Sequence, residues 1–211
     1  MIENITVNEH SSIRIGGERV IYCDPFRIGK AANDADIILI THEHYDHFSP
    51  EDIAKVRKEN TLFVLPESMR PDIVKAAVPV SSARFMEPGG KTEAGGISIE
   101  AVPAYNVLKP FHPKKKGWLG YVLTVGGKRI YICGDTDDTS EARAVKCDIV
   151  MVPIGGTFTM DAKKAAAFVN SLAPVTAIPV HYGTVAGKPG DADDFSALVT
   201  KSVTVVRKLF V

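Results

Sequence analysis

The stretch His42-Glu43-His44-Tyr45-Asp46-His47 holds three of the six histidines of the chain, with the carboxylate of Asp46 among them. The residues just before it, Ile37-Ile38-Leu39-Ile40-Thr41, form an apolar run that predicts a buried strand. Ser49-Pro50 just after it predicts the start of a helix, because Ser is a favoured cap and Pro suits the first helical position. We therefore expect the cluster in a loop between a strand and a helix, where a rigid sheet exposes functional groups.

The residue types in this loop indicate a metal site. Neutral imidazoles together with a carboxylate are the ligand set of zinc, iron or manganese. A chance surface cluster is the alternative, but a short turn has no structural use for so many potential ligands. Side chains alternate along an extended segment, so Glu43 and Tyr45 point away from His42 and His44 and are interpreted as packing or supporting residues.

The composition is that of an ordinary globular protein, with 211 residues, 45% of them hydrophobic and 24% charged. We expect one domain spanning residues 1–211. The net charge of zero gives no bulk electrostatic argument for nucleic acid or membrane binding, and no apolar run is long enough to cross a bilayer. The N-terminus lacks the pattern of a signal peptide. The expected partner is a small-molecule substrate, with no membrane and no nucleic acid, and the oligomeric state stays open.

Three cysteines, Cys23, Cys133 and Cys147, are widely spaced and odd in number. This pattern indicates reduced thiols packed in the core of a cytoplasmic protein, and it does not suggest a disulfide framework.

Hydrophobic periodicity and turn residues predict the elements. Gly16-Gly17 and Gly126-Gly127 predict hairpins. Helices are expected at 49–58, at 67–77, from Asp161 and from Asp191. Strands are expected at 13–15, 19–23, 37–41, 61–65, 97–102, 118–125, 128–133, 148–152, 175–180 and 203–206. Two strand-rich halves, each followed by helices, indicate two sheets packed together with helices outside.

Three later strands also end in polar residues, namely Asp135, His181 and Asn106. Taken singly, each has a simpler interpretation, since a Gly-Asp pair is commonly a turn and one His at a strand end is commonly structural. Together with the first cluster they form a pattern of polar side chains at strand ends. The pattern supplies a carboxylate able to bridge two metals and one further imidazole.

At this point the sequence resembles the metallo-β-lactamase superfamily. Thr41 to His47 matches its HxHxDH signature, Gly134-Asp135-Thr136 its aspartate motif, and Pro179-Val180-His181 its last histidine motif. The chain is most similar to short hydrolases related to ascorbate-6-phosphate lactonase and N-acylphosphatidylethanolamine phospholipase. The resemblance implies an α/β fold, a four-layer αββα sandwich with the metal site at one edge of the two sheets, and a metal-dependent hydrolase.

The resemblance also implies the ligand set. It places a first metal on His42 and His44 and a second on Asp46, His47 and His181, with Asp135 bridging the two. The expected metal is zinc, as one or two ions, with manganese or iron(II) as alternatives. A metal lowers the pKa of bound water, which would be the nucleophile, and Asp46 is expected to orient that water or accept its proton.

One departure from the family concerns the third ligand of the first metal. The family usually has a histidine where this chain has Asn106, and an amide oxygen is a poorer ligand for zinc than imidazole is. The first site is therefore either weak, filled by an oxygen-loving metal that Asn106 ligates, or completed by another residue, for which His112 is the spare histidine nearby. His112 acting as a general acid over the substrate and His112 as an exposed lid residue are the two remaining interpretations.

The loop around His112 is basic, with Lys109, Lys114, Lys115 and Lys116 ahead of Trp118. A solvated loop is the simpler interpretation, and a lid that attracts an anionic substrate is the alternative. We expect substrate contacts at Tyr105, Lys109, Thr157 and Tyr182.

The function expected is hydrolysis of an ester, lactone, amide or phosphodiester bond in a small substrate. A non-catalytic binding protein built on a degraded first metal site is the alternative that Asn106 favours. A metal-centred oxidoreductase is a weaker one, because His44 stands where diiron relatives typically carry a Glu and the chain has no flavin domain.

Overall fold

Thirteen strands form two sheets in the computed structural model, which describes all residues from 1 to 211. The first sheet runs in sequence order and consists of β1 (Ile5–Val7), β2 (Ile13–Ile15), β3 (Ile21–Cys23), β4 (Ala35–Leu39), β5 (Arg57–Pro66) and β6 (Ala83–Met86). The second has the order β13 to β7 and consists of β7 (Lys91–Ala94), β8 (Ile97–Pro103), β9 (Leu119–Val125), β10 (Lys128–Ile132), β11 (Ile149–Pro153), β12 (Thr176–Val180) and β13 (Thr204–Val205).

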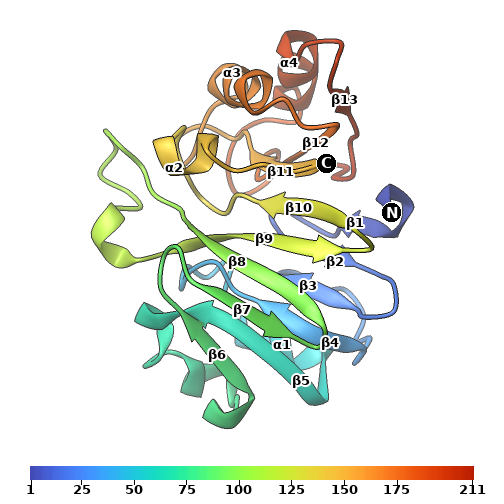
Figure 1. Cartoon of the computed structure of the whole chain (residues 1–211), viewed down its shortest axis with the longest axis vertical. Coiled ribbons are helices and arrows are strands. Elements are labelled where there is room, and N and C mark those ends of the chain that lie inside the picture. Colours follow the sequence, from blue (N-terminus) through green and yellow to red (C-terminus); the bar gives the residue numbers. More distant parts are fainter.

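Helices cover the outer face of each sheet (Figure 1). The four α-helices are α1 (Pro50–Val56), α2 (Ser140–Arg143), α3 (Ala162–Leu172) and α4 (Asp191–Leu198). In Figure 1, α2, α3 and α4 lie together in the upper part of the molecule, while α1 lies in the lower part beside β4 and β5, partly hidden by the strands. This arrangement confirms the expected four-layer αββα sandwich. None of the helices is both long enough and apolar enough to cross a membrane.

Strand β4 shows why the run before the histidine cluster is apolar throughout. Ile37 and Leu39 belong to the large cluster of 44 buried residues between the two sheets. Ile38 and Ile40 belong to a second cluster of 14 residues, which packs α1 against the outer face of the first sheet. Alternating side chains are thus buried on both faces of the strand, as in other parallel strands covered on both sides.

The two sheets join at the edge where β4 ends. The Tyr121 hydroxyl donates to the Ile40 carbonyl at 2.7 Å, and the Leu119 amide donates to the Thr41 carbonyl at 3.1 Å. Gly134 has φ of 64°, and a Cβ there would lie 2.9 Å from the Leu119 carbonyl oxygen. The Cβ would also lie 3.3 Å from the Thr41 side chain at the end of β4, so the tight packing at this edge and the positive φ favour glycine just before Asp135.

Most predicted elements are present, including both hairpins and the helix after Ser49, whose hydroxyl accepts from the Asp52 amide. The helix expected at 67–77 is wrong: two short 3₁₀ helices, Glu67–Met69 and Ile73–Ala76, stand there instead. Pro71 explains the difference, because proline lacks the amide proton and its ring clashes with the preceding helical turn. Strands β1, β6 and β7, each of three or four residues, were not predicted.

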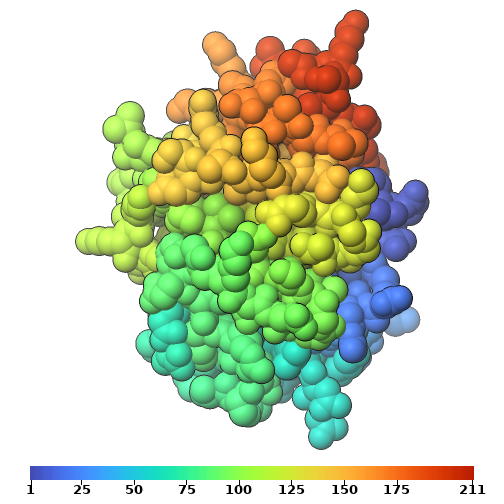
Figure 2. All heavy atoms as spheres, viewed as in Figure 1, coloured from blue at the N-terminus to red at the C-terminus, as the bar shows by residue number.

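The segment between β8 and β9, residues 104–118, projects from the body of the sandwich (Figures 1 and 2). In both views it is the yellow-green segment at the left, with the short 3₁₀ helix Lys114–Lys116 in it. It carries Asn106 and His112, and it forms one wall of the site described next.

Candidate metal centre

All six histidines of the chain meet at one edge of the sandwich. They come from loops that follow β1, β4, β8 and β12, so both sheets contribute. Together with two aspartates they form three overlapping groups whose ligand atoms lie within 4.8 Å of one another: His42, His44 and His112; His10, Asp46, His47 and His181; and His42, His47 and Asp135.

The first group consists of three imidazoles. His42 Nε2 and His44 Nδ1 lie 3.0 Å apart, while His42 Nδ1 is held by the Thr41 hydroxyl at 2.9 Å. His112 is buried, and its ring centroid is 5.2 Å from that of His42. The Trp118 ring packs about 5 Å from all three rings and closes the group from behind. Three imidazoles with an open position are the ligand set of catalytic zinc sites.

The second group combines three imidazoles with a carboxylate. Asp46 Oδ2 lies 3.3 Å from His10 Nε2 and 3.7 Å from His47 Nε2. The His10 and His181 rings stack with centroids 3.7 Å apart. All four side chains are buried, and the sequence alone did not indicate His10.

Asp135 lies between the two groups. Its Oδ2 is 3.3 Å from His112 Nε2 and 3.0 Å from His181 Nε2, and its Oδ1 is 3.4 Å from His47 Nε2. One carboxylate thus faces histidines of both groups. This is the position that a bridging ligand of two ions would take.

Asp24, at the end of β3, supports the centre from outside. Its carboxylate accepts from the Thr41 amide at 2.8 Å and from the Thr41 hydroxyl at 2.6 Å. The same carboxylate lies 2.7 Å from His47 Nδ1, so it orients that ring and leaves Nε2 directed at Asp135. No sequence motif indicated Asp24.

Buried atoms without hydrogen-bond partners show that this donor set fits a metal. Buried polar atoms normally find partners, and orphaned ones need an explanation. Here the orphans converge on one place: both ring nitrogens of His10 and of His181, Nε2 of His47 and of His112, and Oδ1 of Asp135. Bound cations would satisfy one ring nitrogen of each of these histidines and Oδ1 of Asp135.

The surroundings shift the pKa values of the centre. Burial lowers the pKa of His42 well below its usual value, so that the ring is neutral and able to ligate. For His47, burial alone would lower the pKa, but Asp135 and Asp24 outweigh it and raise the pKa to about 9. Burial likewise opposes ionisation of Asp46, yet His10 and His47 lower its pKa to about 2. Asp46 is therefore a carboxylate at neutral pH.

Asn106 braces the loop that carries His112. Its amide nitrogen donates to the carbonyls of Phe111 at 3.0 Å and Phe158 at 2.7 Å, and its backbone amide donates to the His112 carbonyl at 2.8 Å. His112 lies with His42 and His44 in one group of possible ligands, and the Asn106 side-chain oxygen is buried without a hydrogen-bond partner. His112 is not an exposed lid residue, because its side chain is buried. A direct bond from Asn106 to a metal stays a prediction.

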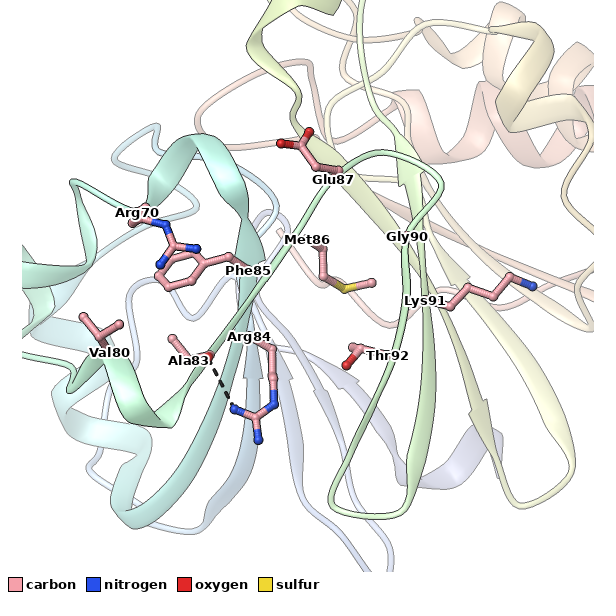
Figure 3. A pocket seen from close by; sticks show the side chains of 10 residues that line it. All are labelled: Arg70, Val80, Ala83, Arg84, Phe85, Met86, Glu87, Gly90, Lys91 and Thr92. Atoms are coloured by element: carbon pink, nitrogen blue, oxygen red, sulfur yellow. Dashed lines mark hydrogen bonds between the residues drawn. The ribbon is translucent and has the colours of Figure 1, made fainter.

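A cavity of about 390 Å³ opens onto the centre. Its polar residues belong to the centre, and its remaining wall is apolar; the lining residues are His44, Tyr45, Asp46, Phe111, His112, Asp135, Phe158, His181 and Val185. A hollow of about 370 Å³ beside β6 and β7 is different (Figure 3). There the Arg70 guanidinium stacks on the Phe85 ring and no histidine is present, so that hollow offers no metal ligands comparable to those of the centre.

The four expected substrate contacts lie outside the cavity wall. The Tyr105 hydroxyl donates to Glu141, and the Tyr182 hydroxyl donates to the Leu209 carbonyl. Lys109 pairs with Asp137 at 2.6 Å, and Thr157 is exposed beside a different hollow. Tyr45, Phe111, Phe158 and Val185 line the cavity instead, and hydrophobicity beside the histidine motifs was the only signal for them.

The chain belongs to the β-lactamase superfamily, because the model of the β-lactamase superfamily domain matches residues 4–181. A UPF0173 metal-dependent hydrolase of Staphylococcus carnosus is 32% identical over 209 residues, which cover 91% of this chain and 90% of the relative. A UPF0173 metal-dependent hydrolase of Thermococcus onnurineus is 30% identical, with 93% and 92% covered. The protein is therefore a metal-dependent hydrolase of this superfamily.

Solved structures agree with the fold. A crystal structure described as that of a metal-dependent hydrolase from Parabacteroides distasonis has a TM-score of 0.81 and 31% identity, covering 98% of this chain and 93% of the other. CmlA, a diiron β-hydroxylase from Streptomyces venezuelae, has a TM-score of 0.75 at 13% identity, with 97% of this chain and 52% of CmlA covered. At that identity the likeness shows the fold alone.

Proposed function

We propose that the protein hydrolyses an uncharged ester, lactone or amide that carries an apolar group next to the bond that is cut. The observation that carries this proposal is an apolar cavity that ends on two groups of metal ligands, with one aspartate between them. Its partner would be a small molecule, because the cavity of about 390 Å³ holds no more than that.

Zinc is the metal that we assign to the centre, with manganese or iron(II) as alternatives. The donors are six imidazoles and the carboxylates of Asp46 and Asp135, and this mixture of nitrogen and oxygen ligands suits zinc. His42, His44 and His112 would hold one ion, the group around Asp46 would hold the other, and Asp135 would contact both. Bound there, the ions would polarise the substrate carbonyl and make a water acidic enough to attack at neutral pH.

The chain's own residues set up the attack. Asp46 lines the cavity and is ionised at neutral pH, so its carboxylate is available to orient the attacking water and accept its proton. We assign His112 to metal binding rather than to proton donation, because its Nε2 lies 3.3 Å from Asp135 inside the cluster. Trp118 and the residues of the projecting loop limit the access of bulk water to these groups.

The cavity wall favours an apolar substrate group over an anionic one. Tyr45, Phe111, Phe158 and Val185 provide the wall, and no lysine or arginine lines it. A phosphate ester would lose hydration on entering such a site, and only the bound metal ions would replace it.

The basic loop supports the same conclusion, because its lysines are already paired. Lys109 contacts Asp137, Lys114 contacts Glu141 at 2.7 Å, and Lys116 contacts Glu43 at 2.9 Å. Lys115 has no such partner, but it lies on the exposed surface of the loop. These pairs favour a loop held by ion pairs over a lid that attracts an anion.

Turnover of matched substrates tests the proposal. Zinc-loaded protein is assayed with p-nitrophenyl acetate, butyrate and hexanoate, and with bis(p-nitrophenyl) phosphate. We expect kcat/KM to rise roughly tenfold or more from acetate to butyrate, because added methylenes fill the apolar wall, and we expect the phosphodiester to be the poorest substrate. Preference for the phosphodiester, or equal rates at every chain length, would overturn the proposal.

Two variants make the assay specific. Phe158→Ala should reduce the preference for longer acyl chains, whereas Leu108→Ala should leave it unchanged. Leu108 is a matched control, because it is 94% exposed on the projecting loop and does not line the cavity. Asp135→Asn should abolish the zinc-dependent rate and thereby exclude a contaminating esterase.

A further inference from the structure

His10 is the one histidine of the cluster that no motif accounts for. It lies in the turn between β1 and β2, more than thirty residues before the first metal motif. Its side chain is completely buried, yet neither of its ring nitrogens has a hydrogen-bond partner. Burying two unpartnered nitrogens is unfavourable, and packing alone would be served better by an apolar side chain.

The backbone holds this ring in place from two directions. The turn is closed by backbone hydrogen bonds from the Asn8 amide to the Ser12 carbonyl and from the Ser12 amide to the Glu9 carbonyl, and the Asn8 side chain donates to the carbonyls of Phe26 and Arg27. The His10 carbonyl accepts from the His181 amide at 2.9 Å. His10 itself has φ of 53°, a conformation uncommon outside glycine that persists only where the surroundings enforce it.

The position of the ring is that of a metal ligand. His10 Nε2 is 3.3 Å from Asp46 Oδ2, and the ring stacks on His181. The ligand atoms of His10, Asp46, His47 and His181 all lie within 4.8 Å of one another. Three imidazoles and one carboxylate around a common point are sufficient to coordinate a zinc ion fully.

We propose that His10 is a further protein ligand of the second metal ion, beside Asp46, His47, His181 and the shared Asp135. The two sites of the centre would then differ. The ion at His10, Asp46, His47 and His181 would have one protein ligand more than the ion at His42, His44 and His112, although residues of both groups line the cavity. A fully ligated zinc site is retained, whereas a site with an open position exchanges ligands, so the second ion would be retained and the first would be labile.

The proposal rests on the metal centre of the proposed function, and zinc titration tests it. The titration needs no turnover, so its result is independent of the substrate assay. Metal-stripped full-length protein is titrated with zinc against a chromogenic chelator. We expect a tight and a weak step in the wild type. His10→Ala and His10→Phe, which restores the packing on His181, should both weaken the tight step by more than about a hundredfold, since losing a neighbour that only orients a ligand weakens binding by about 10–100-fold.

His112→Ala is the matched control, because it should remove the weak step and leave the tight one. A tight step weakened by about a hundredfold or less in both His10 variants would overturn the proposal and leave His10 a packing or positioning residue. Should the His10 variants fail to fold, a crystal structure of the zinc-loaded wild type decides directly. The distance from His10 Nε2 to an ion would be about 2.0–2.1 Å if it is a ligand, and a nitrogen beyond bonding distance of every ion would exclude that role.

Discussion

Asp24 and Asp135 each follow a buried strand at the same edge of the sandwich, yet their positions relative to the metal ligands differ. Asp135 faces the histidines of both groups, whereas Asp24 lies behind His47 and is shielded from the cavity. A carboxylate behind a ligating histidine fixes its ring and strengthens its bond to the metal. The ligand set therefore depends on a residue that contacts no substrate.

Replacing Asp24 by Asn tests this dependence. The amide keeps the shape and still accepts from the Thr41 amide, but it offers His47 no negative charge. We expect zinc affinity to fall by about 10–100-fold, with a smaller effect on folding, measured by chelator competition and circular dichroism. Asp34→Asn is the control, because Asp34 pairs with Arg14 and Tyr22 away from the centre, and it should bind zinc like the wild type.

The pKa of His47 predicts how the metal-free protein responds to pH. The ordinary value is 6.5, and the neighbouring aspartates outweigh burial to raise the pKa to about 9. A raised pKa in the folded state contributes stability that is present below about pH 6.5 and is lost as the pH rises through about 9. The melting temperature of chelator-treated protein should therefore fall over this interval, whereas zinc-loaded protein, in which the ion replaces the proton, should not follow it.

Differential scanning fluorimetry at intervals from pH 6 to about 9.5 measures this effect. His47→Gln, which cannot hold the proton, should flatten the fall in the metal-free protein. A melting temperature that rises across the interval, or that falls equally in wild type and variant, would show that His47 is not the group responsible.

Backbone conformation at single residues marks the centre independently of side-chain chemistry. Nine non-glycine residues have positive φ, and four of them, His10, Asp24, His112 and His181, belong to the centre. Strained conformations persist at functional sites because the surrounding structure enforces them. This signal exists only in three dimensions, which explains why His10 and Asp24 could not be identified as site residues from the sequence.

At the scale of elements, the sequence correctly predicted the strands and helix starts that depend on residues close together in the chain. The apolar run of β4, the Ser49 cap and the Asp161 cap all act within a few residues, and all are present. The strands β6 and β7 were missed: β6 pairs with β5, about 20 residues earlier, whereas β7 pairs with the adjacent strand β8 across Gly95-Gly96. The sequence indicated that the loop from β8 to β9 borders the site. It did not indicate that His112 is buried, because Asn106 holds this loop by a hydrogen bond to Phe158, 52 residues away.

Gly155 ties the loop after β11 to the end of β12, and it gives a prediction at this scale. A Cβ at Gly155 would lie 2.2 Å from the His181 carbonyl oxygen, so the two segments can approach only without a side chain there. Gly155→Ala should destabilise the protein by about 1–3 kcal/mol through overpacking and should also weaken zinc binding by displacing His181.

The two effects are measured by denaturant unfolding and by zinc titration of the folded variant. Gly29→Ala is the control, because a Cβ at Gly29 would meet no atom within 4 Å, and it should match the wild type in both measurements. Unchanged zinc affinity in a destabilised Gly155→Ala would mean that His181 keeps its place without this close approach.

At the scale of the whole molecule, the centre lies where the two sheets meet. The first sheet supplies His10 and the cluster from His42 to His47, and the second supplies His112, Asp135 and His181. The family motifs predicted this edge and six ligand candidates from their order along the chain. Packing of the two sheets brings further residues to this edge that belong to no motif, namely His10 from the first turn and the apolar wall of the cavity.

Because ligands from both sheets surround the centre, bound metal should stabilise the whole fold. A ligand that binds only the folded state at a hundred times its Kd stabilises by about 2.7 kcal/mol, and for a chain of this size each kcal/mol shifts Tm by about 2–4 °C. The metal-free protein should therefore have a Tm roughly 5–10 °C below that of protein with zinc at a hundred times its Kd, measured by calorimetry with and without a chelator. Asp135→Asn, which removes the carboxylate between the groups, should lose most of this difference. An equal Tm in stripped and loaded wild type would mean that the sheets are held at this edge by Tyr121, Leu119 and the apolar core alone.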